Sequence, residues 1–231
     1  MIARSNFAVL ITTMLAVSNA LAADDDIYTF AQADRFEYAE SEDEFVWDLQ
    51  GWVGDDYRKL WIKTEGKRES GSNKDSEIQL LYSRAWSPFF DWQLGVRFDQ
   101  APSPTRSYVV LGTQGLAPQW FEIDAAVFLS DEGEISARLE AEYDLLLTQR
   151  LVLQPRLEWE VSGSNAPERG IGRGTMKTEF GLRLRYEWHR KFAPYIGVNW
   201  SRLGGDTADL ARAIGEDIED TSFIVGLRLW Y

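Results

Sequence analysis

Charged side chains of both signs recur at every second residue through much of this chain, a spacing that places them on one face of β-strands. Carboxylate and guanidinium groups gathered on one face can form ion pairs, or they can line a route for a charged solute. We predict that most of them are structural ion pairs and that a minority serve a solute. The candidates are Lys63, Glu65, Arg97, Asp99, Glu122, Asp124, Arg138, Glu140, Glu142, Arg156, Glu158, Glu160, Arg183, Arg185 and Glu187.

Two pairs of carboxylates within this set have the spacing of a weak metal site. Glu140 with Glu142, and Glu158 with Glu160, each place two carboxylates on the same face of one strand. Oxygen atoms of this kind suit a hard cation. The spacing is common in strands, so these pairs are candidates only.

Ligands for softer metals are few. The chain has no cysteine and a single histidine, His189, and Met176 is the only methionine after the first 22 residues. Both are weak candidate metal ligands. A lone histidine at the end of a strand, such as His189, is more often a surface residue than a ligand. Acyl-transfer chemistry would depend on His189 alone, and the glycine-rich stretch 170–174 lacks the strand–helix context of a phosphate loop. We therefore predict no catalytic residues and no required cofactor.

The strands that must carry these residues follow from the alternation of apolar and polar side chains. The pattern predicts about twelve strands, with ten as the alternative count. Pro155 falls inside one of them and predicts a bulge, because proline has no N–H to donate. The facing of the stretch 108–115 stays undecided. The predicted strands are 31–38, 45–53, 59–67, 77–86, 92–99, 108–115, 121–129, 135–145, 151–161, 179–188, 196–201 and 221–231.

The connections between the predicted strands alternate in length. Short connections fall at 54–57, 87–91, 116–119, 146–150 and 190–193, and longer polar ones at 68–76, 100–106, 163–176 and 204–220. The last of these could contain a brief helix at 207–214. An even strand number with alternating short and long connections is typical of outer-membrane barrels. We predict an all-β fold, an antiparallel up-and-down transmembrane β-barrel of the outer membrane.

Both ends of the chain agree with export to that membrane. Residues 1–22 have the charge, apolar run and small residues of a signal peptide cleaved after Ala22. Residues 23–30 would be a short acidic leader, and residues 31–231 the barrel. The last strand ends on Tyr231, and a terminal aromatic residue resembles the C-terminal signal of bacterial outer-membrane barrels. We expect a protein of the Gram-negative cell outer membrane.

Composition narrows the class of partners. The chain has 24 basic and 37 acidic residues, a balance that repels phosphates and argues against nucleic-acid binding. It also contains 10 Trp, 9 Tyr and 12 Phe. Such residues concentrate in the aromatic girdles of membrane barrels, so outer-membrane lipid is an expected partner. An aromatic-rich soluble β-sandwich is the alternative fold.

Several blocks of sequence resemble the copper resistance protein B family of outer-membrane proteins. They cover nearly all of residues 31–231. The blocks are 51–52 together with 60–66 (LWIKTEG), 77–84 (EIQLLYSR), 91–99 (DWQLGVRFD), 115–133 (GLAPQWFEIDAAVFLSDEG), 140–156 (EAEYDLLLTQRLVLQPR), 181–200 (GLRLRYEWHRKFAPYIGVNW) and 207–217 (TADLARAIGED).

The resemblance implies an outer-membrane barrel of copper homeostasis that binds or passes copper ions, with periplasmic copper-handling proteins as partners. Members of this family often carry a Met- and His-rich segment before the barrel, and the predicted mature start at Ala23 has none. Cu(I) prefers sulfur, whereas Cu(II) accepts imidazole and carboxylate. We therefore expect weak Cu(I) binding, and a Cu(II) site that involves His189 or the two glutamate pairs.

Two other functions remain open at this point. One is a general small-solute pore, or a structural outer-membrane barrel, without metal specificity. The other is a lipid-modifying outer-membrane enzyme. Copper sensitivity of a deletion strain distinguishes a copper protein from a general pore or structural barrel. Turnover of phospholipid or lipopolysaccharide would detect a lipid-modifying enzyme.

Overall fold

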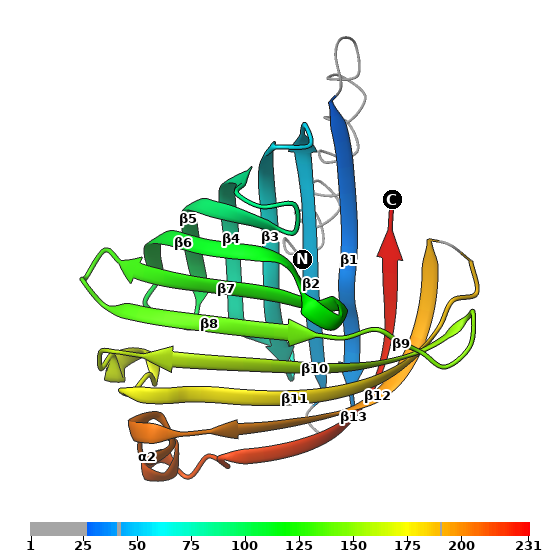
Figure 1. Ribbon diagram of the computed structural model, residues 1–231. Coiled ribbons are helices and arrows are strands. Elements are labelled where there is room, and N and C mark those ends of the chain that lie inside the picture. The colour runs from blue at the N-terminus through cyan, green and yellow to red at the C-terminus, as the bar shows by residue number, and fades with distance from the viewer. Residues whose placement is uncertain (1–26, 41–42, 190) are drawn as a thin grey trace.

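The computed structural model describes residues 27–40, 43–189 and 191–231 (Figure 1). The predicted signal peptide 1–22 lies outside the described residues, as do residues 23–26 of the predicted leader. The first strand begins at Tyr28, so the last three residues of that leader belong to the barrel wall. No helix among the described residues is long and apolar enough to span a membrane.

Antiparallel strands make up nearly all of the described chain, and each predicted strand is present. Their observed bounds are longer than the predicted ones at most ends. The strands are β1 (Tyr28–Ala39), β2 (Glu44–Gly54), β3 (Arg58–Glu69), β4 (Ser72–Ala85), β5 (Phe90–Ala101), β6 (Arg106–Ala117), β7 (Phe121–Ser130), β8 (Ile135–Glu142), β9 (Leu145–Leu146), β10 (Leu151–Ser162), β11 (Gly174–Tyr186), β12 (Phe192–Leu203) and β13 (Glu219–Trp230).

The sheet closes on itself. Each strand pairs with its neighbours in sequence, and β1 pairs with β13, so the wall has no free edge (Figure 1). The short segments β8 and β9 both pair with β10 and act as one interrupted strand. The described chain is therefore a closed barrel of twelve antiparallel strands, as the alternation predicted.

Side chains alternate between the two sides of this wall along most of each strand. Outward residues are apolar and exposed, for example Leu60 at 60% and Phe223 at 76%. Inward residues include polar groups that are almost fully buried, such as Glu77 at 1%. The structure also decides the facing of β6, where Tyr108 and Val110 are buried inside and contact Phe128 and Leu81. Because exposed apolar residues cover the outside, the wall suits a lipid surrounding.

The predicted bulge at Pro155 is wrong. Pro155 pairs regularly with Leu182 on β11, and the irregularity appears instead in the strand on its other side. There β8 ends at Glu142, which pairs with Arg156, and β9 begins at Leu145, which pairs with Leu153, so the interruption is opposite Pro155. Proline has no N–H to donate, so the neighbouring strand leaves the ladder at this point.

A bulge does occur in β1. Ala33 pairs with Leu49, and Arg35 pairs with Asp48, so Asp34 is an extra residue opposite β2. A bulge of this kind changes which face the following side chains take. As a result, Asp34 and Arg35 both point to the interior although they are adjacent in sequence.

Short turns occupy the end of the barrel where β1 begins and β13 ends, called here the terminal end. Asp55 forms one such turn by accepting hydrogen bonds from the backbone N–H groups of Tyr57 and Arg58, at 2.7 and 2.8 Å. These two hydrogen bonds hold the pKa of the Asp55 carboxyl below its ordinary value. A second turn, η1 (Pro118–Trp120), joins β6 to β7.

The opposite end, called here the loop end, carries the two longest connections of the described chain, 163–173 and 204–218. Two other predicted long connections are short. Residues 68–76 form a tight hairpin, because Ser70 and Gly71 adopt positive φ angles of 45° and 86°, and the connection predicted at 100–106 is reduced to 102–105. The connection between β10 and β11 contains η2 (Pro167–Arg169). The connection between β12 and β13 contains the helix α2 (Gly205–Ile214), which includes the predicted helix 207–214.

Candidate functional site

The interior of the barrel holds the charged side chains that the alternation predicted. All of the predicted candidates except Glu187 are buried or line an interior cavity. Glu187 lies just beyond β11 in a turn at the terminal end, with its nearest cationic partner, Arg185, at 3.7 Å. Two cavities lie inside the described part of the barrel. They are named here the inner cavity, near the terminal end, and the outer cavity, near the loop end.

The inner cavity has a volume of about 540 Å³. Its rim at the terminal end includes Pro88, Phe89 and Leu116, and its walls come from β1 to β8 and β13. Eight carboxylates line it against four cationic groups. The carboxylates are Asp34, Asp48, Glu65, Asp91, Glu122, Asp124, Glu140 and Glu142, and the cationic groups are Lys59, Lys63, Arg138 and Arg228.

Several of these carboxylates are paired. Lys59 contacts Asp91 at 2.8 Å, and Lys63 contacts Asp124 at 2.6 Å. A third ion pair joins Arg228 to Asp34 at 2.8 Å. Two further arginines, Arg35 and Arg156, contact other carboxylates of the set from outside the cavity. Eight carboxylates against six cations still leave a formal excess of two negative charges.

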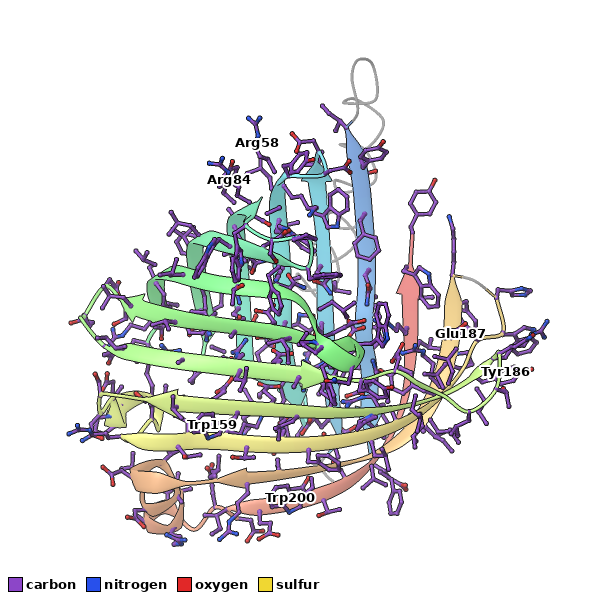
Figure 2. All side chains as sticks on the ribbon, viewed as in Figure 1. Arg58, Arg84, Trp159, Tyr186, Glu187 and Trp200 are labelled. Carbon is purple, nitrogen blue, oxygen red and sulfur yellow. The ribbon has the colours of Figure 1, made fainter. Side chains whose placement is uncertain are left out.

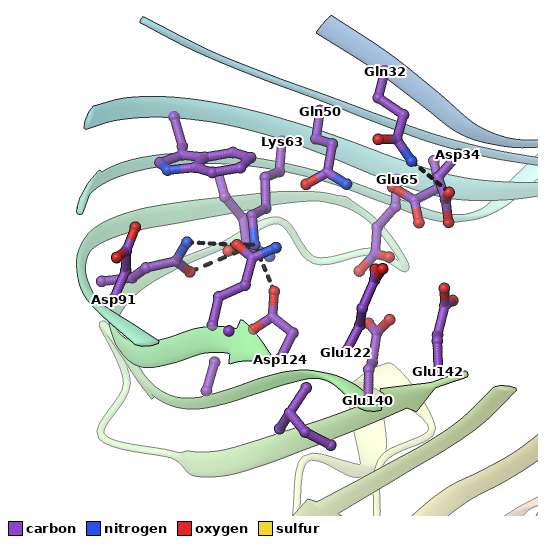
Figure 3. A pocket seen from close by; sticks show the side chains of 18 of the residues that line it. Gln32, Asp34, Gln50, Lys63, Glu65, Asp91, Glu122, Asp124, Glu140 and Glu142 are labelled. Carbon is purple, nitrogen blue, oxygen red and sulfur yellow. Dashed lines mark hydrogen bonds and ion pairs between the residues drawn. The ribbon is translucent and has the colours of Figure 1, made fainter. Parts of the chain in front are cut away.

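The excess lies on β7 and β8. Glu122 is directly opposite Glu142, and Asp124 is directly opposite Glu140. Like charges at directly opposite positions of an antiparallel pair destabilise a sheet unless something compensates them. Arg156 compensates Glu142, at 3.0 Å, whereas Glu122 forms no ion pair with any described residue. Figure 3 shows the carboxylates of Glu122 and Glu140 pointing into the same space as that of Glu65.

The two cavities share two lining residues, Phe128 and Arg138, which therefore stand between them. Arg138 contacts Glu77 at 3.0 Å and Glu160 at 2.8 Å, and it also contacts Glu65. We call these four charged residues the barrier cluster. Its arginine is only 11% exposed and lies 5.7 Å from the centre of the Phe128 ring. Arg138 therefore links carboxylates of β3, β4 and β10 at the level where the two cavities meet.

The outer cavity is smaller, about 220 Å³. The η2 segment folds into it and places Arg169 inside the wall, with its side chain 1% exposed. Arg169 donates a hydrogen bond to Asp99 at 2.8 Å and another to the hydroxyl of Tyr108. Arg97 holds the second oxygen of Asp99, and it also contacts Glu77 of the barrier cluster at 2.7 Å. Ion pairs therefore run without a break from the η2 loop to the barrier cluster.

The remaining predicted candidates form ion pairs along the wall from β8 to β11. Arg156 contacts Glu158 at 2.7 Å and Glu140 at 2.7 Å. Arg185 contacts Asp144 at 2.5 Å. Arg183 forms a buried pair with Glu37, at 2.5 Å, across to β1. These contacts tie the strands together through ion pairs.

The two weak metal candidates lie far apart. Met176 lines the outer cavity near the start of β11, and His189 is an exposed residue in the turn that follows β11. The ring of His189 stacks on Trp188, with centres 6.5 Å apart. Ten residues of strand separate Met176 from Tyr186, which is roughly 33 Å. His189 lies outside both cavities, so the two alternatives for a Cu(II) site, His189 or the glutamate pairs, are separate places in the structure.

Among residues 27–40, 43–189 and 191–231, no group of three or more His, Cys, Asp or Glu side chains has the geometry of a preformed metal site. The inner cavity thus offers an acidic lining rather than a fixed coordination sphere. Sequence reasoning missed several of its members, namely Asp34, Asp48, Asp91 and Arg228. It also missed Arg169, which lies in a connection and follows no alternation.

The whole barrel, from residue 27 to residue 231, matches one family profile, "Copper resistance protein B precursor (CopB)". The chain belongs to the copper resistance protein B family. It is 43% identical over 210 residues to a copper resistance protein B homolog of Pseudomonas syringae pv. tomato, covering 90% of this chain and 71% of that protein. It is 42% identical over 200 residues to a copper resistance protein B of Escherichia coli, covering 86% and 68%. The family supports a role in copper resistance.

Solved structures with a similar fold are outer-membrane porins. The NanC porin superposes with a TM-score of 0.56 at 10% identity, covering 87% of this chain and 99% of that one. The KdgM porin gives a TM-score of 0.52 at 14% identity, covering 87% and 98%. This likeness is one of fold, and together with the family it supports an outer-membrane location. Both findings point to a protein that is not an enzyme.

The same architecture orients the barrel. In outer-membrane barrels the short turns face the periplasm and the longer connections face the outside. The terminal end is therefore the periplasmic end, and the inner cavity lies on the periplasmic side of the barrier cluster. The outer cavity and the η2 segment lie on the external side.

Proposed function

We propose that this copper resistance protein B family member takes up copper ions from the periplasm into the inner cavity and passes them across the outer membrane. One observation carries the proposal. The inner cavity has more carboxylates than cations, and Glu122 is directly opposite Glu142 without an ion pair of its own. A cation placed between these two strands would remove their mutual repulsion.

The chemistry of the lining favours Cu(II). Carboxylate and amide oxygens surround the cavity, including Gln50, Gln93 and Gln114, and sulfur and imidazole are absent from its described lining. Cu(II) accepts oxygen ligands, whereas Cu(I) prefers thioether and thiolate sulfur. Flexible, partly paired carboxylates make a weak site, and weak binding allows an ion to leave again, as conduction requires. We expect micromolar or weaker affinity for Cu(II).

The position of the inner cavity supports loading from the periplasmic side. Its rim residues Pro88 and Phe89 belong to a short turn of the terminal end. Periplasmic copper-handling proteins would be the donors. On this reading the protein is exported by the predicted signal peptide 1–22 and acts in a Gram-negative outer membrane.

The second candidate function is a general small-solute pore. Its support is the presence of two cavities that meet at Phe128 and Arg138 along one barrel interior. The barrier cluster counts against it, because an uncharged solute has no means of separating arginine from its carboxylates. A copper ion, in contrast, competes with Arg138 for the same oxygens.

The test combines a cell measurement with a titration. A deletion strain is complemented with the wild type or with a Glu122→Gln/Glu142→Gln variant, and copper tolerance and cell-associated copper are measured. We expect the variant to fail to restore tolerance and to bind Cu(II) more weakly in a chelator competition. The matched control is Glu132→Gln, an exposed carboxylate of the loop end.

Two results would contradict copper handling. One is full restoration of tolerance by the double variant with unchanged Cu(II) affinity. The other is rapid flux of uncharged sugars through the wild-type protein in liposomes, which would favour the general pore. Heat-modifiable mobility on gels confirms in each case that the variant has folded as a barrel.

A further inference from the structure

Two arginines lie side by side on the outside of the barrel at its periplasmic rim. Arg58, at the start of β3, is directly opposite Arg84, near the end of β4. Both alternate with outward apolar residues, and both are exposed. Figure 2 shows the two side chains next to one another, pointing away from the barrel. Like charges at directly opposite positions are unfavourable, so this pair suits an anion that bridges it.

The protein itself supplies little compensation for these two charges. The nearest carboxylate, Asp55, lies 3.9 Å from Arg58, and its other oxygen accepts the two N–H groups of its own turn. Arg84 forms no ion pair with any described residue, and neither does the neighbouring Asp56. The guanidinium groups are therefore available to an external ligand.

The arginines begin a single cross-strand row on the outward face. Each next member is the direct partner of the one before it, from strand to strand around the barrel. The row runs through Arg58, Arg84, Trp92, Thr113, Ala125, Leu139, Trp159, Thr178 and Arg202. It thus leads from the periplasmic rim to the external rim.

A groove follows the middle of this row. It has a volume of about 350 Å³ and lies between Trp92 at one end and Trp159 at the other. The groove exists because the outward residues along its floor are small, notably Thr113, Ala125 and Ala137. The larger outward side chains that border it, which are Trp92, Leu111, Leu139 and Trp159, are apolar. The groove is therefore shaped for a long apolar chain and offers almost nothing to a polar one.

The dimensions match one leaflet of a bilayer. Four strand-to-strand steps separate Trp92 from Trp159, which is about 19 Å at roughly 4.8 Å per step. Strands in such barrels tilt by about 40°, so a row across them rises by about 12 Å over this length. One leaflet of hydrocarbon is about 15 Å deep. The groove therefore starts at the periplasmic headgroup level and stays within the inner leaflet.

We propose that this row binds a glycerophospholipid of the periplasmic leaflet, with its phosphate between Arg58 and Arg84 and one acyl chain in the groove. Arginine suits phosphate because its fork of N–H donors binds two oxygens at once. Trp92 then lies at the junction of headgroup and chain, the level at which tryptophan is enriched in membrane proteins. The proposal is independent of copper.

The experiment titrates the full-length, detergent-purified barrel with dipalmitoyl phosphatidylglycerol and counts bound lipid by native mass spectrometry. We expect retention of one lipid by the wild type and at least tenfold weaker retention by the double variant Arg58→Gln/Arg84→Gln. The control is Arg202→Gln, which changes an exposed arginine at the opposite end of the same row and should bind like the wild type.

A second arm tests the groove. Ala125→Leu/Ala137→Leu fills its floor with apolar atoms, so it leaves the wall apolar while removing room for the chain. We expect it to weaken phosphatidylglycerol retention as well, and we expect inorganic phosphate alone not to be retained. Equal lipid retention by the wild type and both double variants would overturn the proposal. Retention of free phosphate equal to that of the lipid would show a simple anion site instead.

Discussion

The inner and outer cavities lie on the same inward face and are lined by the same residue types, yet they differ in how their charges are matched. In the outer cavity Asp99 is held by both Arg97 and Arg169. In the inner cavity Glu122 has no cationic partner among the described residues, although Glu142 is directly opposite. The first arrangement fixes structure, and the second leaves ligands available to a cation.

This difference shows that a charged face alone does not mark a functional site. Pairing decides the role, because a carboxylate that already accepts arginine hydrogen bonds has little to give to a metal. The barrier cluster is the boundary between the two cases. Four variants test the contrast between paired and unpaired carboxylates.

The largest effect is expected from Arg138→Gln. It removes the shared partner of Glu65, Glu77 and Glu160. Glu77 keeps Arg97 and Glu65 keeps Arg35, but Glu160 loses its ion pair inside the barrel, and breaking a buried pair costs about 3–5 kcal/mol of unfolding free energy. It also removes the barrier between the cavities, so single-channel conductance in planar bilayers should rise. Arg202→Gln is the control, and wild-type conductance in a folded Arg138→Gln barrel would contradict the assignment of the barrier.

A smaller effect is expected from Arg169→Gln at the loop end. The change removes a charge-assisted hydrogen bond to Asp99, worth roughly 1.5–3 kcal/mol, while Arg97 still compensates that carboxylate. The η2 segment should then be released, and limited proteolysis within 163–173 should become faster. Arg173→Gln, in the same connection but exposed, serves for comparison, and equal cleavage of the two variants would mean that Arg169 does not hold the segment.

Glu122→Gln should leave stability unchanged or raise it by about 0.2–1 kcal/mol, because it removes a like-charge neighbour of Glu142. Affinity for Cu(II) should nevertheless fall about tenfold with the loss of one charged ligand. Urea unfolding and chelator competition measure the two quantities. A loss of stability as large as that of Arg138→Gln would remove the distinction between paired and unpaired carboxylates.

The smallest effect is expected from His189→Ala. Its ring is exposed in the turn after β11, beside Trp188 and outside both cavities. Cu(II) titration of the full-length chain should therefore give the wild-type affinity. A clear loss of binding would move the copper site from the inner cavity to the periplasmic turn.

Much of this arrangement could be predicted from the sequence, because alternation is a direct consequence of strand geometry. It gave the strand order, the barrel class and the inward position of residues such as Arg97, Arg138 and Arg156. It could not give which carboxylates remain unpaired. That property depends on contacts between strands distant in sequence, such as the pair of Arg183 with Glu37.

Other features lacked any local signal. Arg169 enters the lumen from a connection, where no periodicity indicates direction, and only its contacts with Asp99 and Tyr108 reveal its place. Pro155 did indicate an irregularity. The missing N–H of proline, however, affects the adjacent strand whose carbonyl oxygen would have accepted a hydrogen bond from it. The interruption therefore appears between β8 and β9, a position that the sequence of β10 does not specify.

The bulge at Asp34 also sets how this strand tolerates a change of length. Even-numbered residues from Phe30 to Asp34 face the lumen, and odd-numbered ones from Arg35 to Ala39 do so after it. Removing Asp34 would restore simple parity and leave every other side chain of β1 on its present side. Removing one residue nearer the start of β1 would instead invert the part before the deletion. Asp34 is thus the position in this part of β1 where one residue can be removed without changing which side of the wall the other side chains face.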